Sequence, residues 1–198
     1  MNLVLATQNP GKLRELKELA SQFDWLKLEL APADFDPEET GSTFIENAII
    51  KAAAAAEMTG KLSIADDSGI TVVALNGAPG IRSARYCEGT DIDRRRKLLK
   101  ELEAVPDGQR DGAFVCAMAL CDGEGKVLHT TQSEWKGVIG RDERGENGFG
   151  YDPIFFLPDL GLTSAEISPE QKNARSHRGQ AWRSMLTFLN FLHQNHPK

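Results

Sequence analysis

The chain has 198 residues, 40% of them hydrophobic and 26% charged, a composition typical of a folded globular protein and unlike that of a disordered one. A chain of this length buries about 70% of its unfolded surface, so it folds without help from disulfides or a structural metal. The net charge of −6 argues against a general nucleic-acid binder, which carries a basic surplus, but it leaves room for a local basic pocket.

The cysteines and the apolar segments indicate the compartment. Cys87, Cys116 and Cys121 are an odd number without CxxC spacing, which argues against a zinc site and a disulfide framework. The start of the chain has no basic segment followed by a long apolar one, and no run of about 18 apolar residues occurs. We therefore expect neither a signal peptide nor a membrane span, and we expect the protein to be cytoplasmic.

The first third of the chain alternates short apolar runs with helical periodicity. The apolar runs have the length of buried strands and lie at residues 3–6, 26–30 and 62–65. Asn9 is a good helix N-cap and Pro10 suits the first helical position, so a helix is expected after the first strand. A second helix is expected over residues 43–59, where Thr43 and Glu46 have the spacing of a capping box.

The rest of the chain favours consecutive strands. Apolar and β-prone residues predict strands at residues 70–74, 113–120, 127–135 and 154–157, and helical patterns predict helices at 91–103 and from 177 onward. The basic run 94–97 is flanked by acidic residues and predicts a solvated helix face. Helices that alternate with strands, followed by strands in succession, indicate an α/β protein with a mixed sheet.

The first candidate site is the turn after the first strand, with the sequence Thr7-Gln8-Asn9-Pro10-Gly11-Lys12. A strand that runs into a helix N-terminus gathers unpaired N–H groups at the positive end of the helix dipole. Thr7 and Asn9 add side-chain donors and Lys12 adds a full positive charge, a combination that suits phosphate. An ordinary turn with a surface lysine explains the same residues, because the motif is neither a Walker loop nor GxGxxG.

The second candidate site is a set of carboxylates. Asp66 and Asp67 follow the apolar run 62–65, at the end of a strand where open α/β sheets place ligands. Glu38 and Glu39 lie in an acidic loop before the second helix. Mg²⁺ takes one or two carboxylates together with substrate phosphates, and strand alternation lets only one of the two aspartates reach a given metal. A polar turn and a solvated loop are the alternative interpretation.

Two further motifs are candidates for function. If Ser176 caps the last helix, His177 and Arg178 lie in its first turn, where cations oppose the helix dipole; a position that is poor for stability is a hint of function. Phe149 stands between two glycines, so its ring can stack on a base. A solvated basic helix start and a buried loop anchor are the alternatives.

Taken together and in order, these motifs resemble the inosine triphosphate pyrophosphatase family, and within it the RdgB-like bacterial enzymes. The resemblance covers nearly the whole chain and rests on residues 7–12, 39–48, 65–69, 77–86, 148–153 and 176–179. Several separated motifs in one order are far more specific than any single one. Gln8 departs from the pattern, since relatives often carry glycine there, but only its backbone need approach a phosphate.

The resemblance implies an α/β fold with a strongly twisted mixed central sheet flanked by helices. It implies a single domain, residues 1–198, made of two lobes with a cleft between them. It also implies a homodimer without nucleic-acid or membrane partners, and Mg²⁺-dependent hydrolysis of dITP, ITP and XTP or dXTP to the nucleoside monophosphate and pyrophosphate. Such an activity removes deaminated purines from the nucleotide pool.

The resemblance also assigns roles, carried over motif by motif. The triphosphate would be held by Thr7, Gln8, Asn9, Pro10, Gly11 and Lys12, with a further phosphate contact from Lys51. Glu39 and Asp67 would hold Mg²⁺, and Asp67 would also activate the attacking water. The nucleoside and base would be bound by Ser68, Phe149, Gly150, Tyr151, Asp152, Lys172, His177 and Arg178.

The expected donors account for the choice of base. Arg178 only donates hydrogen bonds, and hypoxanthine and xanthine offer an acceptor oxygen at position 6, where adenine has an amino donor. Donor facing donor leaves both groups unpaired, a mismatch that approaches about 10⁴-fold in a hydrogen-bonding site.

Two other functions fit parts of the pattern. One is a Maf-like nucleotide pyrophosphatase, against which residues 176–178 argue. The other is a non-catalytic nucleotide sensor. The pair Glu39 and Asp67 argues against a sensor, because two carboxylates beside phosphates cost affinity unless a metal bridges them.

Overall fold

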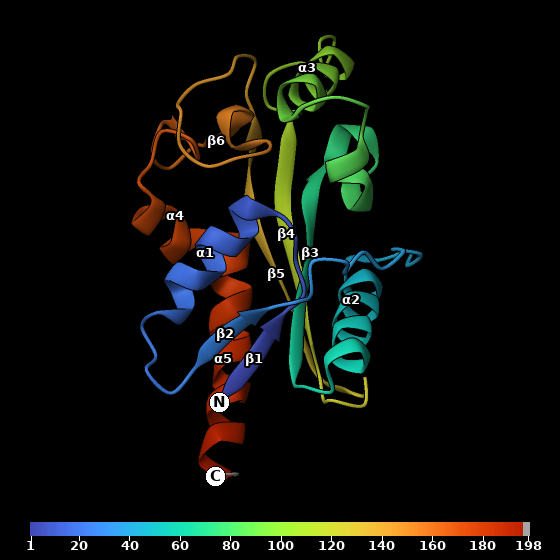
Figure 1. Cartoon of the computed structure of the whole chain (residues 1–198). Helices are drawn as coiled ribbons and strands as arrows, with labels where there is room; N and C mark the ends of the chain where they lie inside the picture. Colours follow the sequence, from blue (N-terminus) through green and yellow to red (C-terminus); the bar gives the residue numbers. More distant parts are fainter. Residues whose placement is uncertain (196–198) are drawn as a thin grey trace. The chain divides into compact units, whose positions relative to one another are not determined.

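The computed structural model describes residues 1–195 and contains a seven-stranded mixed sheet flanked by helices (Figure 1). The strand order is β2-β1-β3-β4-β5-β6-β7. The strands are β1 Asn2–Leu5, β2 Lys27–Leu30, β3 Ser63–Val72, β4 Asp111–Cys121, β5 Val127–Ile139, β6 Phe155–Leu157 and β7 Leu162–Thr163. β1 is parallel to β2 and β3, whereas β6 is antiparallel to β5 and β7. The predicted α/β class with a mixed sheet is confirmed.

The α-helices of the described residues are α1 Pro10–Ala20, α2 Phe44–Thr59, α3 Asp91–Glu101, α4 Pro169–Arg175 and α5 His177–Asn195. Asn9 caps α1 as predicted, since its side chain accepts from two backbone N–H groups of the first turn. Thr43 caps α2 in the same way, but the carboxylate of Glu46 accepts from Ser42 rather than from the backbone of Thr43. The capping box predicted there is therefore only half formed.

The main difference from the predicted elements is the length of β3. The sequence predicts a strand that ends at residue 65, but β3 continues through Asp66 and Asp67 to Val72. The predicted strand end is wrong, because both carboxylates are buried within the strand against cationic partners, Lys12 for Asp66 and Lys51 for Asp67. The short elements α4 and β7 were not predicted, and α3 ends at Glu101 rather than at residue 103.

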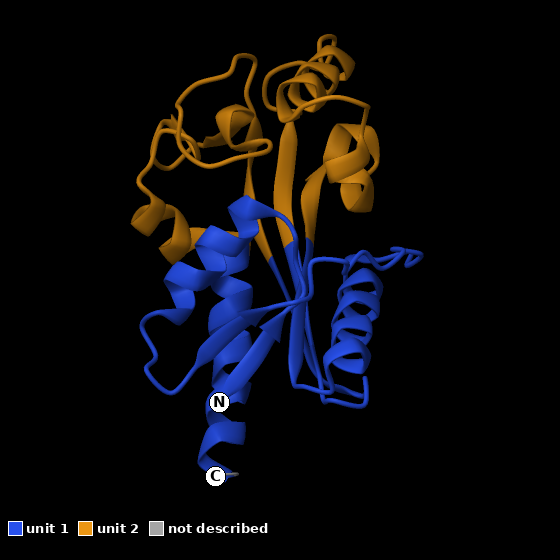
Figure 2. Cartoon of the chain, viewed as in Figure 1, with its two compact units in different colours: residues 1–67, 116–133, 178–198 blue, residues 68–115, 134–177 orange. Residues whose placement is uncertain are grey.

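The chain divides into two compact units, each with its own core (Figure 2). The first unit contains residues 1–67, 116–133 and 178 onward, and the second contains residues 68–115 and 134–177. In the first unit, Leu3 and Leu5 of β1 share a core with Leu16 of α1 and Trp182 of α5. Within this unit α1 and α5 cover one side of the strands and α2 covers the other (Figure 1).

The second unit is built around aromatic side chains. Phe114 of β4 and Trp135 of β5 stack with ring centroids 6.4 Å apart, and Phe155 of β6 packs against both rings. Ile70 of β3 and Leu98 of α3 complete this core with no exposed surface. No helix within residues 1–195 is both long and apolar enough to cross a membrane.

Candidate active site

The turn between β1 and α1 is a capped helix start. The Oδ1 atom of Asn9 accepts from the backbone N–H of Gly11 at 2.9 Å and of Lys12 at 3.1 Å. Thr7 braces the turn, because its hydroxyl accepts from the Asn9 N–H at 3.2 Å. The Gln8 side chain donates to the backbone oxygen of Pro32. The helix N-terminus and the Lys12 ammonium therefore belong to one rigid, partly exposed turn.

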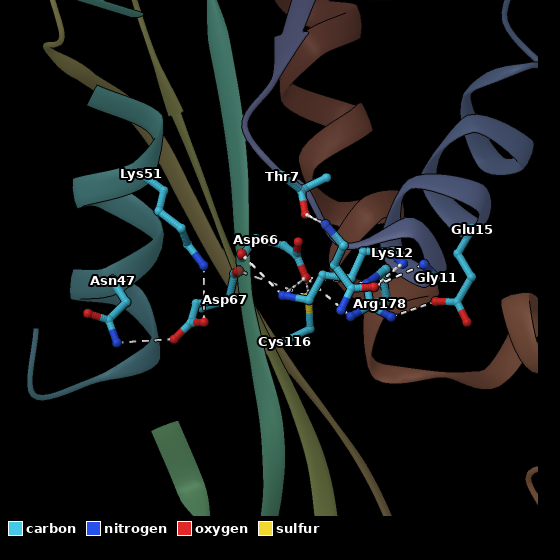
Figure 3. Close-up of polar contacts among 12 residues, drawn as sticks. Thr7, Gly11, Lys12, Glu15, Asn47, Lys51, Asp66, Asp67, Cys116 and Arg178 are labelled. Carbon is cyan, nitrogen blue, oxygen red and sulfur yellow. Dashed lines mark hydrogen bonds and ion pairs between the residues drawn. The ribbon is translucent and has the colours of Figure 1, made fainter. Parts of the chain in front are cut away.

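Asp67 lies on the side of β3 that faces α2 (Figure 3). Its Oδ2 atom accepts from the side-chain amide of Asn47 at 3.3 Å, and its Oδ1 atom is 3.1 Å from the Lys51 ammonium. The same ammonium is 2.7 Å from Oε1 of Glu39. Asn47 is itself fixed, since its Oδ1 accepts from the backbone N–H of Gly41 at 2.8 Å. The two carboxylates predicted to share a cation thus converge on one cationic group.

The electrostatics of this group favour positive charge. Burial by itself disfavours the charged form of Lys51, but the negative charges of Asp67 and Asp66, and then of Glu39, outweigh burial. The pKa of the Lys51 ammonium is consequently raised above its ordinary value. A position where an ammonium lies between two carboxylates suits a cation with oxygen ligands.

The donor set fits a divalent ion that is shared with a phosphate. Among residues 1–195 no three histidine, cysteine, aspartate or glutamate side chains come together as a metal site. Two carboxylates without a third protein ligand leave most of the coordination sphere to other oxygens. Mg²⁺ is bound in this way by one or two carboxylates, water and substrate phosphates.

Asp66 faces the opposite side of β3, toward α1 and α5 (Figure 3). Its Oδ2 atom is 3.1 Å from the Lys12 ammonium and accepts from Nε and Nη2 of Arg178 at 3.3 and 3.2 Å. The remaining guanidinium nitrogen, Nη1, donates to Glu15 at 2.5 Å. Arg178 was expected to face the base; in this structure its guanidinium is 2% exposed and engages two carboxylates of its own unit.

The base-binding candidates of the second unit are organised by Asp152. Its Oδ2 atom accepts from the Lys172 ammonium at 2.6 Å and from the backbone N–H of Phe149 at 2.8 Å, and its Oδ1 atom accepts from Ser164 at 2.8 Å. The Lys172 ammonium also lies 4.8 Å from the centroid of the Phe149 ring. Gly148 has a φ of +77°, and a Cβ there would overlap the Asp152 carboxylate.

The other candidate residues of the second unit also have fixed partners. The His177 ring is buried and stacks on Phe114 with centroids 4.8 Å apart and an angle of 11° between the planes. The Tyr151 hydroxyl donates to the backbone oxygen of Ser83 at 2.8 Å, and burial raises the pKa of that hydroxyl. Ser68 lies half-buried in β3. Residues 149–152, 172 and 177 thus belong to one packed region.

The sequence patterns missed one residue that shapes this region. The basic run 94–97 predicts a solvated face, but Arg95 is buried, which corrects that prediction for this position. Arg95 pairs with Glu143 at 2.7 Å and donates to the backbone oxygen of Gly150 at 2.8 Å. A run of four basic residues gives no signal of which one turns inward, so only the fold identifies it.

The predicted site residues fall into two groups. The first unit holds residues 7–12, Glu39, Lys51, Asp67 and Arg178, and the second holds Ser68, residues 149–152, Lys172 and His177. Within each unit the structure brings most of these residues into direct contact with one another or with a shared partner. Asp66, Glu15 and Asn47 join the first group, although no sequence motif marks Glu15 or Asn47 as a site residue.

The chain is similar to known proteins over nearly its full length. The model of the Ham1 family matches residues 3–188. A dITP/XTP pyrophosphatase of Coxiella burnetii is 47% identical over 199 residues, which cover 96% of this chain and 96% of the relative. A dITP/XTP pyrophosphatase of Pectobacterium atrosepticum is 50% identical over 191 residues, which cover 94% of this chain and 97% of the relative.

Solved structures show the same similarity. A HAM1 protein from Coxiella burnetii superposes with a TM-score of 0.85 at 47% identity, over 96% of this chain and 98% of that one. The Ham1 protein of Staphylococcus aureus gives a TM-score of 0.85 at 41% identity, over 96% of this chain and 98% of that one. The resemblance carried by the sequence motifs is confirmed, and the chain belongs to the Ham1 family.

Proposed function

We propose that this chain hydrolyses dITP, ITP and XTP to the nucleoside monophosphate and pyrophosphate, and so removes deaminated purines from the nucleotide pool. Relatives that are 47% and 50% identical over nearly the whole chain are named dITP/XTP pyrophosphatases. The observation that carries the proposal is the convergence of Glu39 and Asp67 on one ammonium, in the same unit as the capped turn before α1. The proposal includes assembly as a homodimer, which the motif resemblance supports.

The first unit supplies what a triphosphate and its counter-ion need. The ammonium groups of Lys12 and Lys51 and the positive end of the α1 dipole are complementary to phosphate oxygens. Glu39 and Asp67 would hold a divalent cation, which we assign as Mg²⁺ because its preferred ligands are oxygens. When bound, Mg²⁺ neutralises the triphosphate and stabilises negative charge at the reacting phosphorus.

Asp67 is the general base of the proposed reaction. Its carboxylate is only 6% exposed, and contacts from Asn47 and Lys51 fix its orientation. The oxygen of a water molecule forms a bond to the α-phosphorus, and the carboxylate takes the proton of that water. The bond between the α-phosphorus and the bridging oxygen breaks, and pyrophosphate leaves with the bonding electrons.

The second unit supplies groups suited to a purine with an oxygen at position 6. Asp152 accepts hydrogen bonds from the Lys172 ammonium and from the backbone N–H of Phe149, and the ammonium lies beside the Phe149 ring. One carboxylate therefore positions both an aromatic ring for stacking and a hydrogen-bond donor. Donors placed against position 6 match the oxygen of hypoxanthine or xanthine and oppose the amino group of adenine. The proposed binding residues of the second unit are Ser68, Phe149, Gly150, Tyr151, Asp152, Lys172 and His177, and Arg178 of the first unit is proposed with them.

A nucleotide panel tests this function. Purified protein with Mg²⁺ is given dITP, XTP, dATP, dGTP and dTTP, and kcat/KM is measured for each substrate. We expect dITP and XTP to exceed dATP by at least about 10²-fold, within the range that hydrogen-bond mismatches allow. Equal rates for dITP and dATP contradict the proposal, a preference for dTTP indicates a Maf-like enzyme, and binding of dITP without turnover indicates a sensor.

A further inference from the structure

Four charged side chains of the first unit form one buried cluster, which we name the Asp66 cluster: Lys12, Glu15, Asp66 and Arg178. A single oxygen, Oδ2 of Asp66, is shared by the Lys12 ammonium at 3.1 Å and by two guanidinium nitrogens of Arg178 at 3.3 and 3.2 Å. Lys12 also donates to the backbone oxygen of Asp66 at 3.5 Å. Two positive and two negative groups make the cluster neutral.

Burial within the cluster is graded. The side chains of Asp66, Arg178 and Glu15 are 1%, 2% and 9% exposed, and that of Lys12 is 14% exposed. Lys12 is therefore the member with the most surface open to a ligand. The other three members connect the strand β3 to α1 and α5, which lie on the side of β3 opposite to α2 in Figure 3.

The cluster lies apart from the groups assigned to water activation. Asp67, the proposed general base, contacts Asn47 and Lys51 on one side of β3, whereas Asp66 contacts Lys12 and Arg178 on the other. Asp66 is in direct contact with two cations, and its charge also acts at longer range on Lys51. For Asp66 the more exposed of the two is a lysine of the phosphate-binding turn.

We propose that Asp66 is a positioning residue, which holds the Lys12 ammonium in place for the triphosphate while Arg178 and Glu15 fix Asp66 from behind. The inference takes its substrate, a nucleoside triphosphate, from the proposed function. It assigns a role to Asp66, a residue that is not proposed to touch that substrate. Asp66→Asn keeps the shape of the side chain, but it offers the two cations a neutral amide oxygen in place of a charged carboxylate oxygen. The ammonium then has to be ordered when the phosphates bind.

The test is a double-mutant cycle of Asp66 and Lys12. Its readout is the binding of inorganic tripolyphosphate, measured by calorimetry in the absence of metal. In the presence of Lys12, Asp66→Asn should weaken binding about tenfold, the scale of one charge-assisted hydrogen bond. In a Lys12→Met background the same substitution should change binding by less than about twofold, because its effect passes through Lys12. An equal change in both backgrounds, or no change in either, overturns the proposal.

Kinetics with dITP separate positioning from structural damage. Asp66→Asn should raise KM about tenfold and change kcat by less than about threefold, since the contacts of Asp67 remain. A fall in kcat like that of Asp67→Asn would show that β3 is distorted and would overturn the positioning role. Glu29→Gln is the matched control, because it removes a carboxylate of the same unit whose partner, Lys61, is exposed, and it should leave binding unchanged.

If Asp66→Asn does not fold, Arg178→Lys replaces it in the cycle. This change keeps the buried positive charge but loses the two-nitrogen contact with Asp66, and tripolyphosphate has no base for Arg178 to recognise. Binding should weaken about threefold with Lys12 present and remain unchanged in Lys12→Met; equal effects in both backgrounds contradict the proposal. Wild-type protein that binds tripolyphosphate but does not turn over dITP refutes the proposed function alone.

Discussion

Asp66 and Asp67 are neighbours in the sequence but serve different partners, because successive residues of a strand face opposite sides of a sheet. Asp67 meets Asn47 and Lys51 of α2, whereas Asp66 meets cationic groups of α1 and α5. Two adjacent carboxylates can therefore carry different tasks without competing for one cation. We propose that Asp67 activates water and that Asp66 positions the Lys12 ammonium, which binds phosphate.

The first prediction at this scale concerns Asp67→Asn. The amide cannot take a proton from water, so kcat for dITP should fall at least about 10²-fold, the scale of general-base catalysis. The circular dichroism spectrum and the melting curve should show that the variant is folded. A folded variant with nearly full turnover would remove Asp67 from the role of general base.

A second prediction concerns the ammonium between the carboxylates. Lys51→Met leaves Glu39 and Asp67 close together without their shared cation, which should destabilise the protein by about 3 kcal/mol, near the lower end for a broken buried ion pair. At this chain length the melting temperature falls by about 2–4 °C for each kcal/mol. Adding Mg²⁺ should raise the melting temperature of the variant more than that of the wild type, because the ion restores positive charge there.

Lys61→Met is the control for this experiment. Lys61 also pairs with a carboxylate in the first unit, Glu29, but both side chains are exposed, so the change should cost less than about 1 kcal/mol and show no added response to Mg²⁺. Equal stability of Lys51→Met and the wild type, with the same response to Mg²⁺, would rule out a cation position between Glu39 and Asp67.

The sequence predicted that the carboxylates of Glu39 and Asp67 lie close together, but it did not predict the pair formed by Asp66 and Arg178. Glu39 and Asp67 were expected to share one cation, and both carboxylates lie against the Lys51 ammonium. Arg178 and Asp66 are 112 positions apart, and nothing local to either residue indicates the pair. Such a pair forms only because α5 packs on β3, and the packing of two distant elements cannot be read from a single sequence.

Among helices and strands, local sequence signals predicted where the long helices begin. They missed the short elements and the continuation of a strand through polar residues. The Asn9 cap depends only on its neighbours in the sequence and was predicted. α4 has seven residues and β7 has two, too few for a periodic pattern to stand out. β3 continues through a polar segment because its carboxylates find partners on both sides, and that information lies in other elements.

The loop that precedes the 3-10 helix Asp152–Ile154 yields the prediction at this scale. Gly148 adopts a φ of +77°, and an added Cβ would overlap the Asp152 carboxylate that holds Lys172 and Phe149. Gly148→Ala should therefore raise KM for dITP at least about tenfold through the loss of these contacts. Steady-state kinetics and a melting curve measure both consequences.

Gly161→Ala is the matched control for the loop. Gly161 has a φ of +69°, but its added Cβ would meet no atom within 4 Å. Both alanines carry the cost of a positive φ, about 1 kcal/mol, so both variants should melt at a lower temperature. Only Gly148→Ala should lose affinity for dITP; the same kinetic defect in both variants would show that backbone strain, and not Asp152, is responsible.

At the scale of the whole molecule, the candidate residues are divided between two units that interleave along the chain. The chain leaves the first unit after Asp67, returns at Cys116, leaves again after Ser133 and returns at Arg178. The phosphate and cation candidates lie mainly in the first unit, and the base candidates lie mainly in the second. The sequence showed no linker because each transition falls within a strand or at the start of α5, so composition does not mark it.

In the proposed reaction water attacks the α-phosphorus of a deaminated purine triphosphate, so the products identify the reaction. A single-turnover reaction of dITP with Mg²⁺ should release one equivalent of pyrophosphate and one of dIMP, with no orthophosphate. With ¹⁸O-labelled water the label should be found in dIMP. Release of orthophosphate and dIDP, or label found in the pyrophosphate, would contradict the account.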